Sequence, residues 1–90
     1  MAKRIGADKK RLARNLDEAL GAELTDLRIK KGWSQQKFAD VVGFDETYIR
    51  QLERGTKSPT LRSLTHIAEA LSVQPSTMIR SAEHRVKTAK

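Results

Sequence analysis

A short segment near the middle of this 90-residue chain gathers hydrogen-bonding side chains on one side. If residues 46–54 form a helix, positions 46, 47, 50, 51 and 54 share a face opposite Ile49 and Leu52. That face carries a carboxylate, a hydroxyl, an amide and guanidinium groups, which come from Glu46, Thr47, Arg50, Gln51 and Arg54. These groups can exchange hydrogen bonds with a polar partner.

The other polar residues form no catalytic or metal-binding pattern. His66 and His84 have no ligand spacing and the chain has no Cys, so we expect no metal and no cofactor. Four carboxylates lie at helical spacing beside basic residues, which favours a solvated, ion-paired face; they are Asp17, Glu18, Glu23 and Asp26. No glycine-rich phosphate loop is present. The sequence therefore argues against an enzyme and predicts no small-molecule ligand.

The charge balance indicates the class of partner. Eighteen Lys and Arg against 11 Asp and Glu give a net charge of +7 and a pI near 10.2, which indicates a polyanion, nucleic acid before a membrane surface. Residues 1–16 contribute +5 and residues 80–90 contribute +3, so residues 17–79 hold −1. No apolar run approaches the ~20 residues of a membrane span, and no secretory signal follows the basic N-terminus. We expect one small cytoplasmic, nucleoid-associated domain with no membrane partner.

Leucine periodicity and helix-ending residues predict an all-helical protein. A first helix ends at Gly32 and begins near Asp8 or near Asp17; its apolar face comprises Leu12, Leu16, Leu20, Leu24 and Leu27. Ser34 and Asp45 are placed to cap helices over 35–42 and 46–54, which end at Gly43 and Gly55.

Two more helices follow a loop at residues 56–60. Thr60 caps the fourth helix, which ends near Ser72 and has an apolar stripe of Leu61, Leu64, Ile67, Ala68 and Leu71. Pro75 suits the first position of the fifth helix, whose apolar side is formed by Met78, Ile79, Ala82 and Val86.

The two central helices have the spacing of a helix-turn-helix. Ala39 is small where two helices cross, Gly43 can adopt positive φ in a short turn, and Ile49 fills the space between the helices. Helices joined in this way cross at roughly 90 to 120°. The outer side of the second helix is then free to enter a major groove.

With its surroundings, this segment resembles the Cro/CI-type helix-turn-helix family, also called the xenobiotic-response-element family. The match covers about residues 17–72 in one register, and its residues are Leu20-Gly21, Leu24, Leu27-Arg28, Gly32-Trp33-Ser34-Gln35, Phe38-Ala39, Gly43, Tyr48-Ile49, Leu52-Glu53-Arg54-Gly55, Ser58-Pro59, Leu61, Leu64 and Ile67-Ala68-Glu69-Ala70-Leu71. The resemblance implies a compact five-helix, lambda-repressor-like bundle whose second and third helices form the helix-turn-helix. Residues 17–83 form this domain, residues 1–16 are a basic arm or an extension of the first helix, and residues 84–90 are a basic tail.

The resemblance also implies roles for individual residues. Base edges would be contacted by Glu46, Thr47, Arg50 and Gln51. Phosphates would be contacted by Ser34, Gln35, Lys37, Arg54, Lys57, Ser58 and Arg62. Gln35 would also brace the recognition helix. Arg28 and Glu53 would form a structural salt bridge, and Trp33 and Tyr48 are expected to pack rather than to stack on bases. The apolar side of the fifth helix either closes the core of the monomer or forms a homodimer interface, which the resemblance favours; its residues are Met78, Ile79 and Ala82. Both roles hold if Val73 and Met78 are directed inward and Ile79 and Ala82 outward.

Two departures from the family pattern leave alternatives. Gln36 and Lys37 stand where an acidic residue is common, so Lys37 is either a further phosphate contact or a solvated side chain. Asp45 and Glu46 are acidic at the tip that would meet DNA. Glu46 either contacts a base or only complements the helix dipole.

The resulting hypothesis is a sequence-specific regulator of transcription that binds double-stranded DNA as a homodimer on a palindromic operator. It would be similar to phage repressors or to controllers of restriction-modification operons. An antitoxin-like protein that binds a toxin and represses its own operon is the alternative from another class. A nonspecific nucleic-acid coat that acts through charge is a further one.

Overall fold

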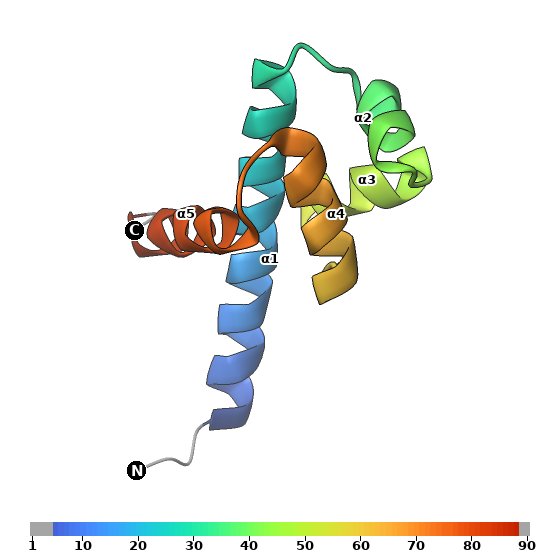
Figure 1. The fold of residues 1–90 in the computed structure, drawn as a ribbon. Coiled ribbons are helices and arrows are strands. Elements are labelled where there is room, and N and C mark those ends of the chain that lie inside the picture. The colour runs from blue at the N-terminus through green and yellow to red at the C-terminus, as the bar shows by residue number, and fades with distance from the viewer. Residues whose placement is uncertain (1–4, 89–90) are drawn as a thin grey trace.

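The computed structural model describes residues 5–88 and shows five helices (Figure 1). They are α1 (Ile5–Lys30), α2 (Gln35–Val42), α3 (Glu46–Arg54), α4 (Leu61–Leu71) and α5 (Pro75–Thr88). The prediction of an all-α, five-helix bundle is confirmed. None of the helices within the described range is both long and apolar enough to cross a membrane.

Local signals determine the helix ends around the helix-turn-helix. The Ser34 hydroxyl accepts a hydrogen bond from the Lys37 N–H at 3.0 Å, and Gly43 ends α2 with a φ of 87°. Thr60 caps α4 in the same way, through the Ser63 N–H at 3.0 Å. The predicted cap at Asp45 is wrong in part: its backbone is extended as a cap requires, but its carboxylate makes no capping hydrogen bond.

The two terminal helices are longer than predicted. Because α1 begins at Ile5, residues 5–16 are an extension of this helix, and the start is earlier than either predicted position. Residues 84–88 belong to α5, so the prediction of a tail from residue 84 is wrong there. Arg85 holds this part of α5 by hydrogen bonds to Glu23 and Asp26 of α1. Residues 1–4 and 89–90 of the predicted arm and tail lie outside the described residues.

The core lies where α1 packs between α5 on one side and α3 on another, and α4 contacts α2 and α5 (Figure 1). Its buried members are Leu20, Leu24, Phe38, Ala39, Ile49, Leu52, Leu64, Ile67, Ala68, Leu71, Met78 and Ala82. Two predicted core leucines are exposed instead: Leu61 keeps 83% of its surface and Leu12 keeps 57%. Leu61 is the first residue of α4, and Leu12 lies at the edge of the bundle, in the groove between α1 and the C-terminal half of α5.

The backbones of α1 and α3 are in direct contact. A Cβ added to Gly21 would lie 2.5 Å from the Leu52 carbonyl oxygen and would also meet the Glu53 carbonyl oxygen. Gly55, just after α3, lies against the backbone of Glu18 in the same way. Glycines at both places therefore let α1 support the C-terminal end of α3 without intervening side chains.

Candidate nucleic-acid interface

The outer face of α3 carries the predicted base-contacting residues together. Ile49 and Leu52 are buried against the core, as the spacing requires. Thr47 and Arg50 are exposed, while Glu46 and Gln51 are partly exposed. A nine-residue helix thus presents a polar surface whose orientation is determined by its apolar side.

Two of these residues are already paired with each other. Arg50 Nη1 donates a hydrogen bond to Glu46 Oε2 at 2.9 Å, and Nη2 lies 3.4 Å from the Thr47 hydroxyl. The Glu46 carboxylate therefore holds the Arg50 guanidinium, which lies one helical turn further along α3. This pairing of Glu46 with Arg50 was not predicted, although the i,i+4 spacing of Glu and Arg on a helix was a signal for it.

A hydrogen-bonded network fixes α3 to the two preceding helices. Arg28 Nε lies 2.7 Å from Glu53 Oε2 and Arg28 Nη2 lies 3.1 Å from Glu53 Oε1, so the predicted salt bridge is present. Arg28 Nη1 also donates to the Trp33 carbonyl oxygen at 2.9 Å. Gln35 Nε2 donates to Glu53 Oε1 at 2.9 Å, so the amide that was predicted to contact a phosphate also braces α3.

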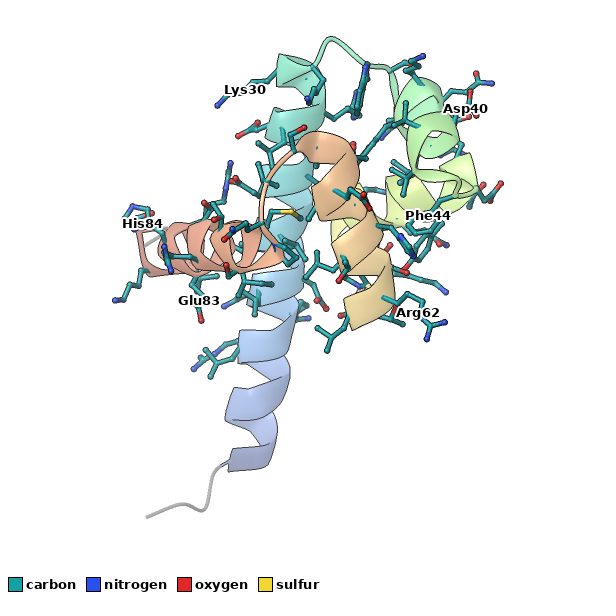
Figure 2. The ribbon with its side chains drawn as sticks, viewed as in Figure 1. Lys30, Asp40, Phe44, Arg62, Glu83 and His84 are labelled. Carbon is teal, nitrogen blue, oxygen red and sulfur yellow. The ribbon has the colours of Figure 1, made fainter. Side chains whose placement is uncertain are left out.

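The predicted phosphate-contacting residues lie around α3. Lys37, Arg54, Lys57 and Arg62 are exposed, and Figure 2 shows Arg62 pointing outward from the N-terminal end of α4. Two predicted hydroxyl contacts are already engaged within the protein. Ser34 caps α2, and the Ser58 hydroxyl donates to Asp17 Oδ1 at 2.5 Å.

Aromatic side chains pack within the protein. Trp33 stacks on Phe38 with ring centroids 6.0 Å apart, and Tyr48 makes an edge contact with Phe44 at 5.4 Å. These contacts agree with the predicted packing role of Trp33 and Tyr48.

The predicted dimer surface on α5 is corrected by the structure. Met78 and Ala82 are both 0% exposed, so the prediction that Ala82 points outward is wrong. Ala82 lies inward because α5 packs against α1 and also contacts α4. Ile79 remains partly exposed. A groove between α1 and α5 is lined by Leu12, Leu16 and Val86 together with four polar or charged residues, Arg80, Glu83, His84 and Lys87.

Comparison with known proteins identifies the same segment. A model of the helix-turn-helix family HTH_3 matches residues 24–77, from the middle of α1 to the start of α5. The HTH-type transcriptional regulator SutR of Escherichia coli is 38% identical over 65 residues, which are 72% of this chain and 36% of SutR. The chain therefore spans about a third of the length of that relative.

Solved structures agree with the described fold. The clp gene regulator ClgR from Corynebacterium glutamicum is similar with a TM-score of 0.78 and 28% identity, covering 82% of this chain and 79% of ClgR. The restriction-modification controller protein C.AhdI from Aeromonas hydrophila gives a TM-score of 0.65 and 33% identity, covering 68% of this chain and 92% of C.AhdI.

Proposed function

The chain belongs to the Cro/CI-type helix-turn-helix family HTH_3, whose members are DNA-binding transcriptional regulators rather than enzymes, and we propose that it binds a palindromic operator as a homodimer. The observation that carries this proposal is the exposed polar face of α3, which presents Arg50 while Ile49 and Leu52 are buried. Its size and shape suit insertion into a major groove, where Arg can donate two hydrogen bonds to guanine.

The residues on and around α3 divide into base contacts and phosphate contacts. Thr47, Arg50 and Gln51 would contact base edges, and Glu46 would orient Arg50. The exposed cations around them would contact phosphates. Gln35 donates one amide hydrogen to Glu53, and its second N–H is available for a phosphate. The network of Arg28 and Glu53 supports this arrangement, because it holds α3 at a constant angle to α1 and α2.

Homodimer formation is part of the same proposal. One short helix contacts only a few base pairs, and two copies on half-sites about 34 Å apart multiply the discrimination. Ile79 is a partly exposed apolar residue of α5, and it is the residue that a second copy would cover. The similarity to C.AhdI favours a restriction-modification controller over the other uses of the family. We expect the protein to act in the cytoplasm, on the nucleoid.

Binding-site selection from a random duplex library, followed by sequencing, tests the proposal. We expect a consensus with two-fold symmetry and half-sites about one helical turn apart. Recovery of no consensus, together with salt-dependent binding to every duplex, would instead indicate a nonspecific coat.

A further inference from the structure

The N-terminal part of α1 extends well past the bundle. Residues 5–16 precede the first buried core residue, Leu20, and at 1.5 Å per residue they measure about 18 Å. Figure 1 shows this blue end of α1 projecting beyond the other four helices. The extension is basic, since residues 5–16 contain four Lys and Arg against one Asp and contribute +3, while residues 17–79 hold −1.

This extension joins the bundle beside the loop between α3 and α4, which would contact phosphates. Asp17 accepts a hydrogen bond from the Ser58 hydroxyl at 2.5 Å, and the backbone of Glu18 lies against Gly55. The loop between α3 and α4 therefore rests on α1 one residue after the extension ends. Lys57 is exposed on that loop, between the exposed Arg54 and Arg62.

The register of α1 places Arg14 about 160° around the helix from both Leu12 and Leu16. Arg14 precedes Asp17 by three residues, so the two lie roughly 60° apart around the helix and share the side that meets the loop. Arg14 is exposed. Leu12 and Leu16 lie on another side, where they line the groove against α5. Arg14 therefore lies on the side of α1 that meets the phosphate-contacting loop, away from Leu12 and Leu16.

From this geometry we propose that the side of α1 that carries Arg14 is a second phosphate-binding surface, which binds the DNA backbone flanking each half-site. The proposal rests on the DNA binding proposed above. An extension of about 18 Å corresponds to about five base pairs at 3.4 Å each, so the affected phosphates lie outside the sequence contacted by α3. The surface raises affinity for every flanking sequence and selects none.

The test compares Arg14→Ala with Lys30→Ala on two duplexes. One duplex ends at the selected operator, and the other carries six further base pairs on each side. Lys30 is a matched control because it is exposed at the opposite end of the same helix, and Figure 2 shows it pointing away from α2 and α3. Binding constants are measured over a range of salt concentrations.

On the longer duplex, Arg14→Ala should bind more weakly than the wild type and reduce the slope of log K against log salt by about 0.9 for each lost contact, or about 1.8 for a dimer. Its selected consensus should be unchanged. On the shorter duplex, Arg14→Ala and Lys30→Ala should match the wild type. Equal binding of the two variants on the longer duplex would overturn the proposal, and so would an equal loss on both duplexes. If the proposed function itself is wrong, the result is different: the wild type then selects no consensus sequence.

Discussion

The Arg28 guanidinium and the Glu53 carboxylate form a two-pronged ion pair where α1 crosses α3, with contacts of 2.7 and 3.1 Å. Their side chains keep only 13% and 5% of their exposed surface. The same carboxylate accepts a hydrogen bond from Gln35 at the start of α2. One acidic side chain on α3 thus connects the helix that carries the base-contacting face to two other helices.

Replacing Glu53 by Gln should therefore destabilise the fold. Arg28 would remain as a shielded cation without a counter-charge, and we expect the free energy of unfolding to fall by about 3 kcal/mol. Urea denaturation measures this change. Glu69→Gln removes an exposed carboxylate of α4 and should stay within about 0.5 kcal/mol of the wild type. Equal midpoints for the two variants would show that the ion pair is solvated.

Arg50 and Glu46 should act as a unit in base selection. Arg50→Ala should lose about 1 to 3 kcal/mol of discrimination at one base pair per half-site, whereas Lys57→Ala should weaken binding to all sequences alike. Glu46→Gln should reduce preference at the same base pair as Arg50→Ala, because Arg50 loses the carboxylate 2.9 Å away that orients it. Competition binding on single-base operator variants gives these preferences. A change at a different base pair would mean that Glu46 contacts a base itself.

Gly21→Ala should separate α1 from α3. The new Cβ would meet two backbone carbonyl oxygens, which no rotamer change can relieve, so we expect a loss of about 3 kcal/mol in unfolding free energy. Gly32→Ala is the control, because its Cβ has open space and only the positive φ of 76° is strained, at about 1 kcal/mol. Thermal or urea unfolding of both variants measures the free energy of unfolding. If Gly21→Ala lowers this free energy no more than Gly32→Ala does, the backbones of α1 and α3 do not cross so closely.

The sequence predicted the central helices because their ends are local events. Ser34, Gly43 and Gly55 act within a few residues of themselves, and α2 and α3 have the predicted bounds. The start of α1 has no such signal. The chain has no Gly or Pro between Gly6 and Gly21, so nothing in the sequence ends the helix where the core ends.

Long-range partners were predicted only where the family resemblance supplied them, as for Arg28 with Glu53, 25 residues apart. The pairing of Ser58 with Asp17 joins residues 41 apart and was not predicted. A periodic pattern shows which side of a helix is apolar, but it does not show how much of that side neighbouring helices cover. Ala82 was therefore predicted outside and Leu61 inside, each against the structure.

Arg85 should hold the C-terminal half of α5 to α1. Hydrogen bonds to Asp26 at 2.5 Å and to Glu23 at 3.1 Å, opposed by partial desolvation, raise the pKa of Arg85 above its ordinary value. A raised pKa of a cation means that its stabilising effect is complete below the unfolded-state pKa and is lost only as pH rises through the folded-state pKa. Amide exchange of residues 82–88, corrected for the intrinsic dependence on pH, should thus give the same protection from about pH 7 to about pH 10.

Arg85→Ala should reduce protection in this segment, since no cation then bridges the two carboxylates. Arg80→Ala, an exposed cation on the same helix, should leave protection unchanged. Loss of wild-type protection between about pH 7 and about pH 10 would mean that a group other than Arg85 holds the segment.

Ile79 should determine self-association. An aspartate at this partly exposed apolar position would place a charge within the proposed dimer surface, where no partner neutralises it. We expect Ile79→Asp to sediment as a monomer at concentrations where the wild type is a dimer, with a helical circular dichroism spectrum that shows it is folded. Val41→Asp changes another exposed apolar residue, on α2, and should remain dimeric. If Ile79→Asp is folded and dimeric, α5 is not the interface, and Leu12→Asp then tests the groove beside it.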